Sequence, residues 1–255
     1  MHDHDPDAPT QRRRRGIYLL PNLFTTGTLF AGFYAIIAAT QDYFTVASIA
    51  IFVAMLTDML DGRVARWTRA ETDFGIQFDS LADLVAFGMA SSLVAFMFSL
   101  DALAQTSDVA GKLGWLAAFF YIASAALRLA RFNIARGAPT EKNHFVGLPS
   151  PAAAGVLVGF VWVMTRMGVS GDQVVVPVFG LTVATGALMV SNVRYRSFKK
   201  LSTRRRVPFH YVLAMVGVFV LIVLFPPFVL FAAFFGFALS GPVEAILRRR
   251  HIRRN

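Results

Sequence analysis

Four aspartates within long apolar stretches are the residues of this chain best suited to chemistry. Asp58 and Asp61 are three residues apart, and Asp79 and Asp83 are four apart. On a helix, either spacing places both side chains on one face. A charged side chain at the centre of a membrane helix costs about 2.5–3.5 kcal/mol, so such residues are usually functional. We therefore predict that the four carboxylates converge on a metal site.

The chemistry expected of this site follows from its charge and its ligand type. Clustered carboxylates repel one another unless cations compensate them, and nearby arginines supply only part of that charge. Oxygen-only ligands favour hard cations, Mg²⁺, Mn²⁺ or Ca²⁺, over zinc. Two divalent cations beside a phosphoryl group stabilise both the attacking and the leaving oxygen of a displacement. The aspartates therefore indicate phosphoryl-type transfer.

Small and basic residues beside the aspartates suit a phosphate ligand. Gly62 directly follows Asp61 and leaves room for a bulky substrate, and Gly75 lies at the expected turn between the two pairs. Arg66 lies one turn after Gly62, where its guanidinium can donate two hydrogen bonds to phosphate oxygens. Helix packing or helix capping is the alternative explanation for each glycine alone.

The composition places these residues in an integral membrane protein. The chain of 255 residues is 56% hydrophobic and 16% charged, with a mean hydropathy of +0.56. It has no cysteine, which excludes disulfides, thiolate metal sites and cysteine nucleophiles. The net charge of +10 lies in short clusters between apolar segments, which favours membrane orientation over nucleic-acid binding.

The hydrophobic pattern predicts an all-α fold with eight membrane-spanning helices. A span needs about 20 apolar residues, and the candidates are 17–40, 44–66, 77–100, 113–135, 150–167, 174–192, 208–225 and 227–246. With both termini cytoplasmic, 23 of the 25 lysines and arginines fall on the inner side. Pro226 and Pro227 leave almost no loop, so a single bent or re-entrant segment is the alternative for the last two spans.

The expected organisation is one membrane-embedded catalytic domain over residues 17–247. A basic, disordered tail precedes it at 1–16 and a second basic tail follows at 248–255. The aspartate pairs would lie at the cytoplasmic face of the inner membrane.

The spacing Asp58-x2-Asp61-Gly62-x2-Ala65-Arg66-x8-Gly75-x3-Asp79-x3-Asp83 resembles the full signature of the CDP-alcohol phosphotransferase family. This resemblance implies that the four aspartates hold two divalent cations and that Asp83 is also the general base. It implies that the cytidine nucleotide packs against Gly62, Ala65 and Arg66, and that a CDP-linked lipid reacts with an alcohol, releasing CMP. A homodimer is implied as well.

Three further blocks resemble those of bacterial phosphatidylserine synthases within this family. They begin with Pro21-Asn22-Leu23-Phe24-Thr25, with Ala126-Leu127-Arg128 and with Phe145-Val146-Gly147. The resemblance implies CDP-diacylglycerol and L-serine as substrates, with membrane lipid as a further partner. It also suggests that Asn22 and Thr25 contact the lipid diphosphate, although both could instead cap a helix. Thr72 would bind nucleotide or phosphate, or simply form a turn.

The acceptor pocket is expected near the end of the fourth span. Arg128 and Arg131 are three residues apart and can bind a carboxylate in a bidentate manner, and Asn133 can add an amide contact. The alternative is that these arginines only orient the span.

Several functions remain open at this point. Glycerol 3-phosphate, inositol phosphate or choline could replace serine as the acceptor. A divalent-cation transporter would also hold intramembrane aspartates, although both pairs are expected at one interface and no other span has a central acid. A binding protein with an inactive site is a third possibility.

Overall fold

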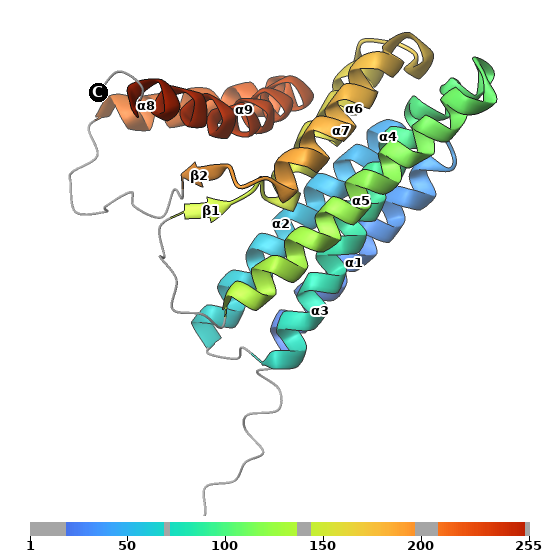
Figure 1. The fold of residues 1–255 in the computed structure, drawn as a ribbon. Helices are drawn as coiled ribbons and strands as arrows, with labels where there is room; N and C mark the ends of the chain where they lie inside the picture. The colour runs from blue at the N-terminus through green and yellow to red at the C-terminus, as the bar shows by residue number, and fades with distance from the viewer. Residues whose placement is uncertain (1–18, 69–71, 137–143, 197–208, 253–255) are drawn as a thin grey trace, which may run out of the picture.

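The computed structural model describes residues 19–68, 72–136, 144–196 and 209–252 and consists mainly of helices (Figure 1). The tail predicted at 1–16 lies outside these residues. Six helical segments are long and apolar enough to cross a membrane: Asn22–Ala39, Phe44–Val64, Asp73–Phe98, Asp108–Ile134, Gly171–Val190 and Pro226–Leu247. Two shorter apolar helices lie at Ser150–Arg166 and Met215–Leu224. The predicted α-helical membrane fold is confirmed, and each of the eight predicted spans falls on one of these segments.

The first two helices form the framework on which the aspartates lie. Helix α1 covers Leu19–Ala39 and helix α2 covers Phe44–Thr68. A tight turn joins them, in which Asp42 has a positive φ of 61°. Both helices contribute small buried residues to one apolar cluster, so their backbones approach closely. The polar end of α2 and the beginning of the third span lie together at the lower end of the bundle in Figure 1.

The third span is built from three consecutive helical segments. Helix α3 covers Asp73–Asp83, the π-helical segment η2 covers Leu84–Ala90, and helix α4 covers Ser91–Phe98. The span begins at Asp73, earlier than the predicted residue 77, because the Thr72 side chain caps α3 by accepting a hydrogen bond from the Gly75 N–H at 3.0 Å. π-Helical turns are frequent at functional sites, and this one starts directly after Asp83.

The remaining helices complete the bundle on the other side of the third span. The 3₁₀ segment η3 (Leu100–Gln105) leads into the long helix α5 (Asp108–Arg136). Helix α6 covers Ser150–Arg166, the 3₁₀ turn η4 covers Gly171–Val174, and helix α7 covers Val175–Val190. A second apolar cluster lies between α5, α6 and α7 and includes the fully buried Tyr121 and Leu157.

A short β-ribbon is an addition to the predicted all-α fold. Strand β1 (His144–Val146) pairs antiparallel with strand β2 (Arg194–Arg196). Val146 lies opposite Arg194 in this pair, although 47 residues separate the two along the chain. Gly147 has a φ of 83°, which glycine adopts without strain, and its N–H donates to the Val193 carbonyl at 2.8 Å. The buried Tyr195 donates its hydroxyl to the Ala238 carbonyl at 3.1 Å, which ties the ribbon to the last helix.

The last two predicted spans correspond to two separate helices, of which the second is long enough to cross a membrane and the first is a shorter apolar helix. Helix α8 covers Phe209–Leu224, and helix α9 starts at Pro226, a position that proline tolerates because no helical N–H partner is lost there. Figure 1 shows this pair running across the direction of the other helices. Helix α9 continues to Ile252, into the region predicted as the C-terminal tail. It packs on α6, where any Cβ on Gly155 would lie 2.5 Å from the Phe234 ring.

Candidate active site

Three of the four predicted aspartates form a compact carboxylate group at the junction of α2 and α3. Asp58, Asp61 and Asp79 each offer a carboxylate oxygen, and these oxygens lie within 4.8 Å of one another. Asp61 is the most enclosed of the three, with 5% of its surface exposed. The helical spacing of the pairs and the return of the chain from α2 to α3 therefore bring the predicted ligands together.

The fourth aspartate lies directly beside this group. A side-chain hydrogen bond joins Asp83 to Asp58. The charge of Asp83 interacts with the charges of the other three aspartates and with that of Arg128. One carboxylate oxygen of Asp83, Oδ1, is buried and has no hydrogen-bond partner in the described part of the chain. Asp83 thus lies close to the other aspartates and to Arg128 of α5, with an acceptor atom available for a further ligand.

The carboxylate group has the donor set that a hard divalent cation requires. Among the described residues, the donors that converge here are all oxygens, and Mg²⁺ and Ca²⁺ bind oxygen at about 2.0–2.6 Å. Two oxygens on opposite sides of such a cation lie about 4–5 Å apart, which agrees with the 4.8 Å spread of the three carboxylates. The predicted metal site therefore has a suitable cluster of aspartates.

Helix α1 supports the carboxylate group through a residue within the helix, not at its N-terminal cap. Thr25 is buried and donates a hydrogen bond from Oγ1 to Oδ2 of Asp61 at 3.0 Å. Because α1 is helical from Leu19, Asn22 and Thr25 do not cap it, and that alternative is wrong. A Cβ on Gly75 would lie 3.2 Å from Thr72 Oγ1 and 3.5 Å from Asn22 Oδ1, so these three residues lie together at the start of α3.

The predicted phosphate-binding residues of α2 lie on the turn after Asp61. A Cβ on Gly62 would meet the Arg66 guanidinium nitrogens at 3.7 and 3.9 Å, so the guanidinium lies over the glycine. The Arg66 side chain is exposed and available to a ligand. Ala65 lies on the same turn of α2, between Gly62 and Arg66.

Helix α5 places two residues of the predicted serine-binding pocket against α6 and α3. Arg128 donates from Nη1 to Ser150 Oγ at 2.9 Å, and Asn133 donates from Nδ2 to Ser80 Oγ at 2.9 Å. Each side chain keeps one buried atom without a partner among the described residues, Nε of Arg128 and Oδ1 of Asn133. One of these atoms is a donor and the other an acceptor.

Arg131 differs from Arg128 in what it contacts. Its guanidinium donates to the carbonyl of Val146 at 2.9 Å and, at 3.4–3.5 Å, to three carbonyls at the end of α7, those of Met189, Val190 and Ser191. These bonds hold the β-ribbon and α7 against α5. The structure therefore does not bring its guanidinium to the same partners as Arg128.

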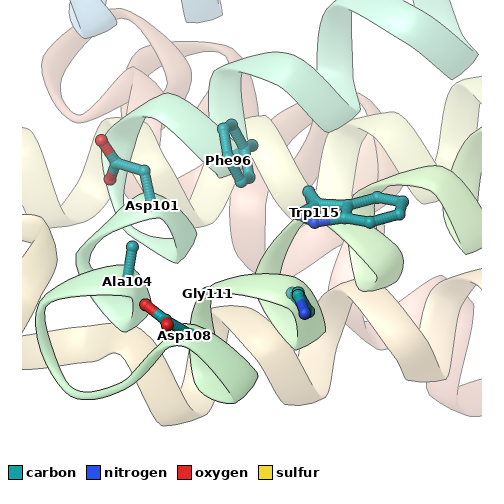
Figure 2. A pocket seen from close by; sticks show the side chains of 7 residues that line it. Phe96, Asp101, Ala104, Asp108, Gly111 and Trp115 are labelled. Carbon is teal, nitrogen blue, oxygen red and sulfur yellow. The ribbon is translucent and has the colours of Figure 1, made fainter.

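A cavity of about 370 Å³ lies at the opposite end of the third span from Asp79 (Figure 2). Asp101 and Ala104 from η3 lie on one side of it, and Trp115 of α5 lies on the other. Partial burial, and then the charge of Asp42, raise the pKa of Asp101. None of the predicted site residues lines this cavity, so it is separate from the aspartate site.

Comparison with known proteins decides the family. A sequence profile described as CDP-alcohol phosphatidyltransferase matches residues 18–193. The chain belongs to the CDP-alcohol phosphatidyltransferase family. It is 38% identical over 184 residues to the CDP-diacylglycerol–serine O-phosphatidyltransferase of Helicobacter pylori, covering 72% of this chain and 74% of that protein. Identity to the proteins of the same name is 31% over 229 residues in Mycobacterium leprae (87% and 72% covered) and 32% over 181 residues in Bacillus subtilis (71% and 92% covered).

The region matched by the CDP-alcohol phosphatidyltransferase profile contains every predicted site residue. It runs from before Asn22 to beyond Asn133 and ends at the ribbon, before helices α8 and α9. The resemblance proposed from the signature is therefore confirmed at the level of the family.

Sequence reasoning missed two hydroxyls in this phosphatidyltransferase site, Ser80 and Ser150. Ser80 lies within the signature between Asp79 and Asp83, and Ser150 lies in the block that opens α6. Both positions were within recognised blocks, but nothing in the sequence shows that these side chains bind Asn133 and Arg128.

Proposed function

We propose that this chain transfers the phosphatidyl group of CDP-diacylglycerol to the hydroxyl of L-serine, giving phosphatidylserine and CMP. The observation that carries the proposal is a set of three buried atoms, on Asp83, Arg128 and Asn133, that have no partner among the residues the structure describes. Nε of Arg128 is a donor suited to the serine carboxylate, Oδ1 of Asn133 is an acceptor suited to the ammonium, and Oδ1 of Asp83 is an acceptor suited to the hydroxyl. The printed names of the relatives support the same acceptor.

In this reaction Asp83 acts as the general base. The serine hydroxyl oxygen attacks the phosphorus that carries the diacylglycerol, its proton passes to Asp83, and the bond from that phosphorus to the bridging oxygen of CMP breaks. A serine hydroxyl has a high pKa, so a carboxylate at hydrogen-bond distance contributes by accepting the proton as the new bond forms. The closeness of Asp83 to Arg128 and to the other aspartates supports this role.

The donor nucleotide and diphosphate are held by residues of α1, α2 and α3. Asn22, Thr72 and Gly75 form one side at the start of α3. Thr25 orients Asp61, and the exposed Arg66 guanidinium over Gly62 binds phosphate oxygens, with Ala65 on the same turn. The small residues leave room for the nucleotide to approach the helix backbone.

Asp58, Asp61 and Asp79, with Asp83 shared, hold two divalent cations, Mg²⁺ or Mn²⁺ with Ca²⁺ as a further candidate. When bound, these cations offset the negative charge of the diphosphate and of the developing alkoxide. The oxygen-only donor set supports this assignment. Arg131 adds positive charge to the serine pocket while its hydrogen bonds hold the ribbon and α7.

The enzyme would work at the cytoplasmic face of the inner membrane. The tails and loops predicted on the same side of the membrane as the aspartates contain most of the lysines and arginines, which supports this orientation. Exposed apolar side chains on α2 and α3, such as Met59, Phe74 and Leu81, would face the acyl chains of the lipid. A homodimer is proposed from the family resemblance.

The proposal is tested by acceptor-dependent CMP release from the purified full chain in detergent. CDP-diacylglycerol and Mn²⁺ or Mg²⁺ would be supplied with L-serine, glycerol 3-phosphate, inositol phosphate or choline. We expect release that requires both L-serine and the metal. Release with a different acceptor only would overturn the serine assignment, and release with none of them would overturn the proposed reaction.

A further inference from the structure

The side chain of Asn133 is held in one orientation by a chain of two hydrogen bonds. Ser80 Oγ donates to the Ile76 carbonyl at 3.0 Å, and Asn133 Nδ2 donates to Ser80 Oγ at 2.9 Å. A serine hydroxyl has a single proton. Because that proton is used by the Ile76 carbonyl, the oxygen of Ser80 can only accept a hydrogen bond from its other neighbour.

This arrangement determines which end of the Asn133 amide is available. An amide has a donor end and an acceptor end, and their assignment follows from the partners around them. Only the NH₂ group can face the accepting oxygen of Ser80. The carbonyl oxygen, Oδ1, must therefore point away, and it is buried with no partner in the described ranges. An unpartnered buried acceptor costs about 1–3 kcal/mol, which a ligand that donates a hydrogen bond can recover.

The side chain of Arg128 is likewise held by a serine hydroxyl, that of Ser150 on α6. Its Nη1 donates to the buried Ser150 at 2.9 Å, and its Nε is left as a buried donor. Two hydroxyls from different helices thus leave one acceptor and one donor for a ligand. Ser80 lies three residues before Asp83 on α3, so the hydroxyl that holds Asn133 is on the same face of the helix as the expected base.

We propose that Ser80 is a specificity-determining residue that acts through Asn133 and selects acceptors with a primary ammonium next to the reacting hydroxyl. The inference rests on the proposed function, and it names the acceptor class as 2-amino alcohols. Ser80 itself is a positioning residue, because it touches Asn133 and not the acceptor. A hydroxyl in place of the ammonium can donate one hydrogen bond to Oδ1 but carries no charge, so it is bound more weakly.

The test compares L-serine with glycerate, in which a hydroxyl replaces the ammonium, in the wild type and in Ser80→Ala. Removal of the serine oxygen leaves the Asn133 amide free to rotate and present its NH₂ group, which repels an ammonium. We expect the ratio of kcat/KM for L-serine to that for glycerate to fall about tenfold, the effect of losing one hydrogen bond to a charged group. KM for CDP-diacylglycerol should stay within about twofold.

Two further variants separate positioning from general damage. Ser80→Thr keeps the hydroxyl and should restore the wild-type ratio. Ser240→Ala removes a hydroxyl of the same type, which donates to the Phe237 carbonyl on the exposed part of α9, and should leave the ratio unchanged. If Ser80→Ala turns over too slowly, binding of both acceptors by calorimetry replaces the kinetic ratio, with the same tenfold change expected.

An unchanged ratio in Ser80→Ala would overturn the inference while leaving the proposed function intact. Absence of serine turnover and serine binding in the wild type would instead overturn the proposed function itself.

Discussion

Buried polar groups in the middle of the helix bundle differ from those at the aspartate end. In the middle, side-chain hydroxyls are satisfied by backbone carbonyls: Ser92 by Ala118 at 3.0 Å and Tyr121 by Phe87 at 3.2 Å. At the aspartate end, Asp83, Arg128 and Asn133 each keep a buried atom without a partner. Ser48 is the one other residue with such an atom in the part of the chain that the structure describes.

This difference separates stability from function. A buried polar atom without a partner is costly, so proteins pair such atoms unless another requirement intervenes. The paired hydroxyls in the middle join helices and stabilise the bundle. The unpaired atoms at the aspartate end include a donor and two acceptors, as expected for atoms that bind a ligand. Changes at the two regions should therefore affect different measurements.

The largest effect is expected at the aspartate end, from Asp83→Asn. The amide cannot accept the serine proton, so kcat should fall about 10³- to 10⁴-fold, the upper range for loss of a general base. Binding of the CDP-linked lipid should change by less than about threefold. CMP release and nucleotide binding would be measured on the same preparation. Asp73→Asn, an exposed aspartate on the same helix, is the control and should keep its activity; full turnover in Asp83→Asn would remove Asp83 from the base role.

A smaller effect is expected from Thr25→Val, which removes the hydrogen bond to Asp61 without changing the size of the side chain. Loss of such a partner of a metal ligand typically costs about 10- to 100-fold in metal affinity. The Mn²⁺ concentration that gives half-maximal activity should rise accordingly. Thr26→Val is a matched control, because Thr26 is exposed and donates only to the Asn22 carbonyl of its own helix. Equal metal dependence of the two variants would contradict the supporting role of Thr25.

The smallest effect is expected in the middle of the bundle, from Tyr121→Phe. This change leaves the Phe87 carbonyl without its partner and should cost about 1 kcal/mol of stability. A cost of this size lowers Tm by about 2–4 °C in a chain of this length. The kcat of the folded enzyme should not change, and Tyr34→Phe, at an exposed position, should alter neither quantity. A loss of kcat without a change in Tm would show that the two regions are not separated as described.

The sequence predicted the features that depend on local spacing. The aspartate group followed from intervals of three and four residues on helices, and the membrane fold followed from the lengths of the apolar segments. Gly62 and Arg66 are adjacent for the same reason, since they are one helical turn apart. Thr25 was recognised only by resemblance, because its contact with Asp61 requires α1 to pack against α2.

The features that the sequence could not predict depend on contacts between distant segments. The pairing of Asn133 with Ser80 spans 53 residues, and that of Arg128 with Ser150 spans 22. The ribbon and the carbonyls around Arg131 arise only when α7 returns to α5. The π-helical turn after Asp83 also could not be predicted, because an apolar stretch carries no signal for it. Gly32 of α1 makes room for this turn, since a Cβ there would lie 2.7 Å from Ala86 Cα.

The most direct test of the account is a cycle of two acceptors and two enzymes. L-serine and ethanolamine, which lacks the carboxylate, would be compared in the wild type and in Arg128→Lys by CMP release. If the free Nε of Arg128 binds the carboxylate, kcat/KM for serine should fall at least tenfold in the variant while the value for ethanolamine stays nearly constant. An equal fall for both acceptors would contradict the claim that the unpaired atoms at the aspartate end are the contacts of the acceptor.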